Sequence, residues 1–257
     1  MSQSLARGLH ILIELGRGPA SLDQLAESTG AHKTTVLRLL RTLADERFVF
    51  RDGSHRYHVG SRIFELSSRA LDQREVRGIA APHLAAFNRQ HGRTTHLAVL
   101  EGRDVVYVDK LESHDQIRMH SRIGLRAPLH SSAVGKVLLA DLPDDELHEL
   151  MSDLELPRAT ANTITDPNTL LAELAGVRTR GWAHEREENE PSINCIAAPI
   201  RGASGRALAA VSVSVPAFVL AYEQLLEILP ALLAVAARIS QDCGWQPAAT
   251  GSKGLSA

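Results

Sequence analysis

The chain has 257 residues, of which 44% are hydrophobic and 23% charged, a composition typical of soluble globular proteins and a length sufficient for two domains. No apolar run approaches the roughly 18 residues that a membrane span requires, and the N-terminal sequence does not resemble a cleavable signal peptide. Cys195 and Cys243 form neither a disulfide framework nor a Cys-x-x-Cys motif. We therefore expect a cytoplasmic protein that does not contact a membrane.

The net charge of −2 hides an uneven distribution. Residues 1–60 hold 8 basic and 6 acidic side chains, a net charge of +2, whereas the rest of the chain has a net charge of −4. A basic N-terminal segment on an acidic body indicates an anionic partner for that segment.

Two short helices are predicted at the start of the chain. Within residues 4–16, four apolar residues recur at helical spacing, namely Leu5, Leu9, Leu12 and Ile13. Residues 21–30 begin with a capping box, in which Ser21 and Gln24 satisfy free backbone groups, and end at Gly30.

A third helix is expected over residues 31–48 and has two contrasting faces. The apolar face carries Val36, Leu39, Leu40 and Leu43. The outward face carries basic and hydroxyl side chains, namely Lys33, Thr34, Thr35, Arg38, Arg41 and Thr42. Two helices joined by a short turn, the second with such a face, are typical of a helix-turn-helix.

A β-hairpin is predicted next, because residues 48–59 alternate around a turn at Asp52 and Gly53. Three helices and a hairpin within residues 1–60 describe a winged helix-turn-helix domain that binds DNA. We expect base contacts from Lys33, Thr34, Thr35 and Arg38, and phosphate contacts from Arg41, Arg51 and Arg56. A basic helix face alone is more often a solvated surface, but the order of all five elements favours DNA binding.

A linker helix over residues 61–73 leads into a second domain over residues 74–245. The linker offers apolar side chains to a symmetry mate, namely Ile63, Leu66, Ala70 and Leu71.

The second domain begins with a helix over residues 74–91, with Pro82 expected in a first helical turn. Alternating β-branched segments predict strands at residues 94–100, 104–111, 116–124, 193–200 and 207–215. Further helices are predicted at residues 131–142, 143–154, 166–182 and 222–244. This pattern describes an α+β domain with an antiparallel sheet, followed by a tail at residues 246–257 that we expect to be disordered.

The segment PLHSSAVGK, residues 128–136, suggests three kinds of chemistry and matches no template for any of them. It lacks Gly-x-Ser-x-Gly, its lysine lies four residues after Ser132 where Ser-x-x-Lys needs three, and a P-loop would need glycine at position 130. A hydrolase or metal-dependent enzyme using His130 and Ser131 therefore remains the weaker alternative. His120, His130 and His184 are candidate metal ligands, but no His-x-x-x-His motif or cysteine pair accompanies them. We expect no catalysis, no metal and no cofactor.

Nearly the whole chain, from about Ser4 to Trp245, resembles the IclR family of bacterial transcriptional regulators. The resemblance rests on HKTTVLRLLRTLADERFV, GLRAPLHSSAVGKVLLA and RGWAHEREENEPSINCIAAPI. It implies a GAF-like effector-binding domain, a homodimer or dimer of dimers, and a palindromic operator. The function it implies is regulation, most simply repression, of a catabolic operon in response to a small organic or sugar acid.

The family's effector site, carried over position by position, falls on Ala133, Val134, Glu185, Cys195, Ser212 and Ser214. Two departures stand out: Ser192 occupies a position where the family often has Gly, and Glu185 one where several relatives have Asp.

These residue types suit a small dicarboxylate, keto-acid or uronate. Ser212 and Ser214 would face the same side of a strand, and Ala133 and Val134 would present free N–H groups at a helix start, where the helix dipole favours an anion. The two serines are equally consistent with ordinary strand hydroxyls, and a residue such as Cys195 is more often an inert buried side chain than a reactive thiol.

Overall fold

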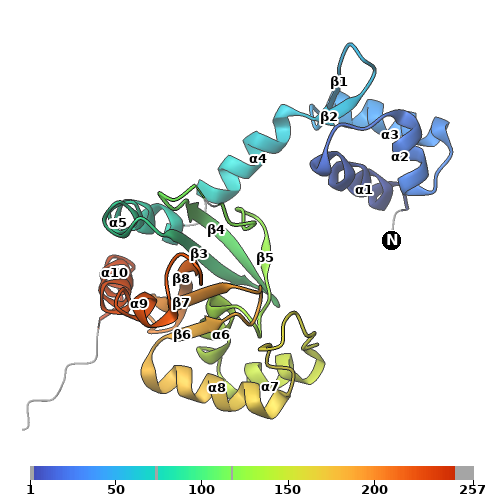
Figure 1. Cartoon of the computed structure of the whole chain (residues 1–257). Helices are drawn as coiled ribbons and strands as arrows, with labels where there is room; N and C mark the ends of the chain where they lie inside the picture. The colour runs from blue at the N-terminus through green and yellow to red at the C-terminus, as the bar shows by residue number, and fades with distance from the viewer. Residues whose placement is uncertain (1–2, 73–74, 117, 247–257) are drawn as a thin grey trace, which may run out of the picture. The chain divides into compact units, whose positions relative to one another are not determined.

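The chain folds into two units, each of which buries its own apolar side chains. The computed structural model describes residues 3–72, 75–116 and 118–246, and divides into one unit from Met1 to Gln73 and a second from Arg74 to Ala257 (Figure 1). The expected fold class, α+β, is confirmed. The expected disordered tail lies outside the described residues, apart from Gln246.

The first unit is a three-helix arrangement completed by a short hairpin and a fourth helix. Its elements are α1 (Gln3–Arg17), α2 (Leu22–Thr29), α3 (Lys33–Asp45), β1 (Val49–Arg51), β2 (Tyr57–Val59) and α4 (Ser61–Asp72). The core is formed by Ile11, Leu15, Leu25, Val36, Leu40, Val49 and Tyr57. A backbone pairing between Ala20 and Tyr57 ties the hairpin to the turn before α2.

Local signals explain how these helices start and stop. The Ser21–Gln24 capping box is present, and Gly30 ends α2 in the left-handed conformation with φ of 60°. His32 is the N-cap of α3 and residues 46–48 lead into β1, so α3 is shorter at both ends than expected.

The apolar stripe that the sequence suggests on the first helix is not the buried one. Ile11 and Leu15 are buried, whereas Leu5, Leu9 and Ile13 are 65%, 53% and 60% exposed. Helical spacing identifies an apolar stripe but not which of two adjacent stripes meets α2 and α3.

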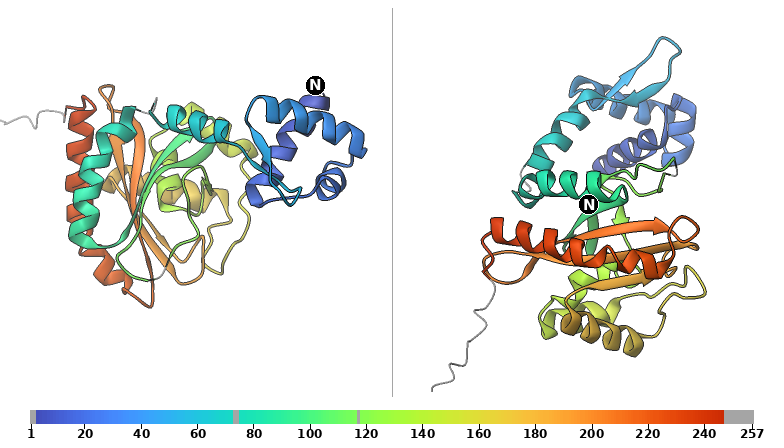
Figure 2. Two further views of the ribbon diagram at one scale, coloured as in Figure 1. Left: turned by 90° about the horizontal axis from the view of Figure 1, so that it is seen from above. Right: turned by 60° about the vertical axis from the view of Figure 1, so that its left-hand side comes forward.

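The second unit is a six-stranded antiparallel sheet between two layers of helices (Figure 2). The order β5-β4-β3-β8-β7-β6 joins β3 (Thr94–Glu101), β4 (Asp104–Leu111), β5 (Arg126–Ala127), β6 (Ala183–Arg186), β7 (Ile193–Arg201) and β8 (Ala207–Pro216). One face is covered by α5 (Glu75–His91), α9 (Tyr222–Leu226) and α10 (Leu229–Asp242). The other face is covered by α6 (Ala133–Ala140), α7 (Asp144–Asp153) and α8 (Pro167–Arg180).

One predicted strand does not form, and two short strands that were not predicted, β5 and β6, lie at the two edges of the sheet. Residues 116–124 form no strand in their described part, because the Met119 and Ser121 carbonyls accept hydrogen bonds from Lys110 Nζ, at 3.0 and 2.6 Å, rather than from a strand ladder. The edge strand β6 was not expected, because four residues with the sequence AHER give too short an alternation to identify.

Two prolines also act differently from expectation. Pro82 lies in the interior of α5 and not in its first turn. The closing helix, expected to be continuous, divides into α9 and α10 just before Pro230, which has no N–H to continue a helix.

Of the apolar linker side chains, Ile63 is partly buried and Leu66 exposed, and those of Ala70 and Leu71 lie outside the described side chains. None of the helices in the described part of the chain has the length and hydropathy that a bilayer crossing needs.

Gly135 lets the first turn of α6 pack directly against the backbone of the preceding turn. A Cβ at this position would lie 2.4 Å from the Leu129 carbonyl oxygen and 2.7 Å from that of Pro128. Neither atom can move without shifting the main chain, so the site has room only for glycine.

We expect Gly135→Ala to lower the free energy of unfolding by roughly 1–3 kcal/mol, as overpacking against backbone does. The matched control is Gly78→Ala in α5, where nothing lies within 4 Å of the added Cβ. That change should stabilise the protein by about 0.5–1 kcal/mol, because alanine restricts the unfolded chain and favours a helix. Urea unfolding of both variants measures the difference, and a Gly135→Ala variant as stable as Gly78→Ala would contradict the packing.

Candidate functional site

A cavity in the second unit is lined by all six residues that the sequence assigns to the effector site, namely Ala133, Val134, Glu185, Cys195, Ser212 and Ser214. Its empty space, including the part open to solvent, is about 420 Å³. Residues from the start of α6 and from β6, β7 and β8 meet here although they are far apart in the chain.

The sheet contributes a row of polar side chains across three neighbouring strands. Glu185 on β6 is paired with Cys195 on β7, which is paired with Ser214 on β8, so the three side chains lie on one face. The Cys195 thiol donates to Ser214 Oγ at 3.1 Å. Ser212, two residues before Ser214, faces the same side and is paired with His96 on β3.

The start of α6 supplies backbone donors. Ser132 is the N-cap, and its Oγ accepts the Gly135 N–H at 3.0 Å. The N–H groups of Ala133 and Val134 have no acceptor within the helix, as in the first turn of any α-helix, and both residues line the cavity. This end of the helix is therefore suited to a negatively charged group.

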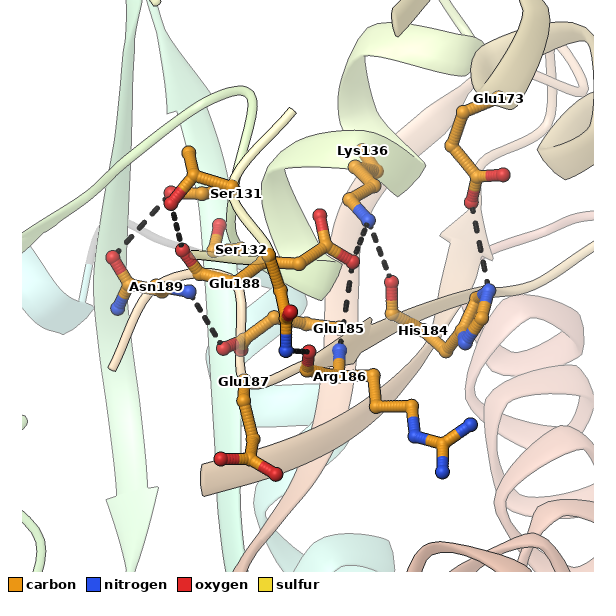
Figure 3. Close-up of polar contacts among 12 residues, drawn as sticks. Ser131, Ser132, Lys136, Glu173, His184, Glu185, Arg186, Glu187, Glu188 and Asn189 are labelled. Carbon is orange, nitrogen blue, oxygen red and sulfur yellow. Dashed lines mark hydrogen bonds and ion pairs between the residues drawn. The ribbon is translucent and has the colours of Figure 1, made fainter. Parts of the chain in front are cut away.

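Residues 187–192, the β6–β7 loop, close another side of the cavity (Figure 3). The Asn189 N–H donates to Glu185 Oε1 at 3.0 Å, a contact within reach of the longer glutamate side chain. Ser192 has a φ of +61°, in the left-handed region that favours glycine. Its N–H donates to Glu187 Oε2 at 2.9 Å, and its carbonyl accepts the Ala217 N–H at 2.7 Å.

Burial controls the ionisation of the cavity side chains. Glu185 is 2% exposed, and burial raises its pKa to about 7. Burial also raises the pKa of the Cys195 thiol well above its ordinary value and raises the pKa of Tyr107, which lines the same cavity. Glu185 and Glu190 are the carboxylates of the lining, and no lysine, arginine or histidine is among the described residues that form it.

His96, on the next strand β3, lies beside Ser214 as a neutral side chain. Its Nε2 is 2.7 Å from Ser121 Oγ and its Nδ1 is 3.5 Å from Ser214 Oγ. Burial, assisted by the positive charge of Lys110, lowers its pKa to about 3, so the ring is uncharged at neutral pH. Its ring also packs on Tyr107, with centroids 4.7 Å apart.

Sequence reasoning missed seven lining residues, namely Tyr107, Met119, Ser121, Ser132, Asn189, Glu190 and Ile193. Tyr107 and Ile193 lie on predicted strands, so their alternation was the only available signal. Met119 and Ser121 lie in a segment whose alternation predicts a strand that does not form, whereas Asn189 and Glu190 lie in a loop without a periodic pattern.

The candidate DNA-binding surface lies on α3 and the hairpin of the first unit. Lys33, Thr34, Arg38 and Arg41 are exposed, and Thr35 is partly so. Lys33 Nζ is 2.8 Å from Asp23 Oδ1, an exposed ion pair, and Thr34 Oγ1 is 2.8 Å from His32 Nδ1. The turn of three residues between α2 and α3 matches the expected helix-turn-helix.

The hairpin is organised by Asp52. Its Oδ1 accepts the N–H groups of Ser54 and Arg56, both at 2.9 Å, and its Oδ2 is 2.7 Å from His58 Nε2. These hydrogen bonds hold the pKa of Asp52 well below its ordinary value, and the bond with His58 has the largest effect.

The two hairpin arginines expected to hold phosphates have contacts of their own. The Arg51 guanidinium lies over the Tyr57 ring, 5.6 Å from its centroid. The Arg56 guanidinium donates to the Pro19 carbonyl, so this side chain is engaged within the unit.

Comparison with known proteins assigns both parts of the chain. Residues 68–241 match the family model described as bacterial transcriptional regulator IclR C-terminal, and residues 4–53 match the IclR helix-turn-helix domain. The chain belongs to the IclR family of bacterial transcriptional regulators. Among IclR-related sequences, the regulator KdgR of Escherichia coli K12 is 35% identical over 225 residues, covering 87% of this chain and 86% of KdgR. The repressor AllR of the same strain is 32% identical over 218 residues, covering 84% of this chain and 80% of AllR.

Solved IclR structures share the fold. The IclR protein of Thermotoga maritima matches with a TM-score of 0.83 at 34% identity, covering 95% of this chain and 100% of that one. An IclR homologue from Microbacterium hydrocarbonoxydans, complexed with 4-hydroxybenzoate, matches with a TM-score of 0.77 at 26% identity, covering 93% and 99%. Because these relatives are transcriptional regulators, the present IclR chain is a ligand-responsive, DNA-binding regulator and not an enzyme.

The alternative enzyme site of this IclR protein has no catalytic geometry. His130 Nε2 donates to the Pro157 carbonyl at 3.1 Å, whereas Ser131 Oγ donates to Asn189 Oδ1 at 3.4 Å, so the two side chains are engaged elsewhere. His184 Nδ1 is 2.6 Å from the Tyr222 hydroxyl, and His120 is exposed and outside the cavity lining. Within the described residues no group of three or more His, Cys, Asp or Glu side chains is arranged to hold a metal ion.

Glu185 makes the stability of this IclR protein depend on pH. Its pKa is raised from 4.5 to about 7 on folding, so the folded state binds more protons across this window and stability falls as pH rises through it. We expect Glu185→Gln, which cannot ionise, to be more stable than wild type at pH 8 by up to about 3 kcal/mol, and to lose this advantage near pH 4.5.

Denaturant unfolding of both proteins at these two pH values checks this expectation. The difference between variant and wild type cancels the contributions of other groups, including His96. A difference that is the same at both pH values would contradict the raised pKa.

Proposed function

We propose that this IclR-family protein represses a catabolic operon and senses a small monocarboxylic acid that carries hydroxyl groups. The observation that carries the proposal is the cavity, which combines the N–H groups at the start of α6 with Glu185 and Glu190 and has no cation in its described lining. One end of a ligand would therefore be an anion and the rest would have to donate hydrogen bonds.

The carboxylate of the effector is assigned to the donors. An anion can bind to neutral donors here, namely the N–H groups of Ala133 and Val134 and the hydroxyls of Ser212 and Ser214. No charged side chain of the protein then has to lose its hydration. A second carboxylate on the ligand would meet Glu185 and Glu190, and like charges in a partly buried site repel strongly. A hydroxyl there would instead donate to either glutamate, which favours a hydroxy acid over a dicarboxylate.

Two relatives support this assignment. AllR is named a repressor, and the Microbacterium hydrocarbonoxydans homologue was solved with 4-hydroxybenzoate, a ligand with one carboxylate and one hydroxyl. By analogy, the present chain would release its operator when the acid binds.

For DNA recognition we propose a homodimer, or a dimer of dimers, on a palindromic operator. Two α3 helices would enter successive major grooves, about 34 Å apart. Lys33, Thr34, Thr35 and Arg38 would meet base edges, and Arg41, Arg51 and Arg56 would hold phosphates. Arg56 would first have to leave the Pro19 carbonyl. The effector alters operator affinity only through its different affinities for two arrangements of the protein.

Arg38 and Arg41 are expected to differ in how their loss affects DNA binding. Arg38→Ala should relax sequence preference by roughly 1–3 kcal/mol, because a base contact is lost. Arg41→Ala should weaken all sequences alike and reduce the salt slope by about one, because a phosphate contact is lost. Both are measured by titrating an operator selected from random DNA, and a scrambled copy, at several salt concentrations. Unchanged discrimination in Arg38→Ala would refute its role.

The ligand class is tested with three acids of equal chain length: D-gluconate with hydroxyls, adipate with a second carboxylate, and hexanoate with neither. We expect D-gluconate to give the largest rise in Tm and to release the selected operator in a gel shift. Ser212→Ala should weaken D-gluconate binding by about tenfold, the value of one hydrogen bond to a charged group, whereas Ser204→Ala, in an exposed turn, should not. Stabilisation by adipate and not by D-gluconate would overturn the assignment.

A further inference from the structure

Lys136 carries its charge into the interior of the second unit. It lies on α6, one turn beyond Ala133, and is 1% exposed. Its Nζ donates to Glu188 Oε1 at 2.6 Å and to the His184 carbonyl at 2.9 Å (Figure 3). Glu188 is itself 7% exposed, and its Oε2 is buried without a hydrogen-bond partner. The helix that begins at the cavity is thus joined by a buried charge to the β6–β7 loop.

The loop is held at Glu188 and meets the cavity one residue later. The Glu188 carbonyl accepts hydrogen bonds from Thr163 Oγ1 at 2.7 Å and Thr160 Oγ1 at 3.3 Å. The next residue, Asn189, lines the cavity and donates its N–H to Glu185 Oε1. The position of Glu188 therefore determines where the Asn189 N–H lies.

A buried ion pair is a poor source of stability, because desolvation of both charges offsets most of their attraction. Its stronger effect is on conformation. A Glu188 carboxylate away from Lys136 would be buried and unpaired, which is costly, so only loop conformations that keep the two in contact are low in energy. Because Asn189 follows Glu188 in the loop, the position of its N–H is restricted as well.

We propose that Lys136 is a positioning residue of the effector cavity, which through Glu188 holds the Asn189 N–H on the Glu185 carboxylate. The functional meaning of this role rests on the effector site proposed above. The arrangement itself is measurable in the ligand-free protein.

The ion pair also influences Glu185 electrostatically. The ionisable groups around Glu185 are Tyr107 on β4, Lys136 on α6, Cys195 on β7, and Glu188 and Glu190 in the β6–β7 loop. Burial is the main cause of its raised pKa; Glu188 raises that pKa further and Lys136 lowers it. Glu188 in turn faces Lys136 and, from α8, Glu173. Removal of the Lys136 charge should therefore raise the Glu185 pKa, and removal of the Glu188 charge should lower it. A role in packing alone would not produce two shifts of opposite sign.

Hydrogen exchange of the Asn189 amide in the full-length, ligand-free protein tests the positioning. Lys136→Met keeps an unbranched side chain and removes the ammonium group, and we expect exchange at Asn189 to be at least about tenfold faster, with protection kept in β8. Glu188→Gln can still accept from Lys136 and should keep most of the protection. The control is the exposed pair Arg206–Glu146, 3.2 Å apart, where Arg206→Met and Glu146→Gln should change nothing.

Carboxyl ¹³C NMR of glutamate-labelled protein tests the electrostatic part. The Glu185 resonance is assigned by its loss in Glu185→Gln. We expect its pKa to rise in Lys136→Met and to fall in Glu188→Gln, each by at least about half a unit.

Wild-type protection of Asn189 in Lys136→Met, or pKa shifts of the same sign in the two variants, would overturn the proposal. If Lys136→Met does not fold by circular dichroism, Glu188→Gln decides, and an unchanged Glu185 pKa in that variant would refute the role. Failure of every carboxylate to bind would count against the proposed effector and would leave both of these measurements unaffected.

Discussion

The first turn of α6 approaches the backbone of residues 128–129 so closely that no side chain fits at position 135. Because Ser132 caps the helix at the same point, the N–H groups of Ala133 and Val134 are held against the sheet and line the cavity. The row formed by Glu185, Cys195 and Ser214 faces this helix end across the cavity space. The other walls of the cavity are arranged around the start of α6, which cannot move without the backbone of residues 128–129.

The two units use charge in opposite ways. On α3, side chains such as Arg38 and Arg41 are exposed to solvent, so in the proposed DNA contacts their electrostatic attraction would be long-ranged and screened by salt. The described lining of the cavity has neutral donors and helix N–H groups but no lysine, arginine or histidine, and burial raises the pKa of Glu185 to about 7, so that this side chain is about half protonated at neutral pH. Such buried interactions are short-ranged and little screened. Ionic strength therefore acts mainly on the DNA-binding surface.

The parts of the fold that were predictable have signals local to the sequence. The capping box at Ser21 and the left-handed Gly30 mark helix ends wherever they occur, and both have these roles in the structure. The positions of the effector residues came from a family resemblance, since two serines on a strand do not by themselves indicate a ligand.

What could not be predicted depends on contacts between distant residues. The segment that carries Met119 and Ser121 alternates like a strand but is hydrogen-bonded to Lys110, and the β6–β7 loop, which has no periodic pattern, is hydrogen-bonded to Lys136. The choice between two apolar stripes on α1 depends likewise on where α2 and α3 lie. Irregular walls also leave room for variation: Met119, Asn189 and Glu190 line the cavity from irregular segments of the second unit, whereas α3 belongs to the first unit. Libraries randomised at these positions are accordingly a route to biosensors in which the cavity binds other small molecules while the DNA-binding unit is unchanged.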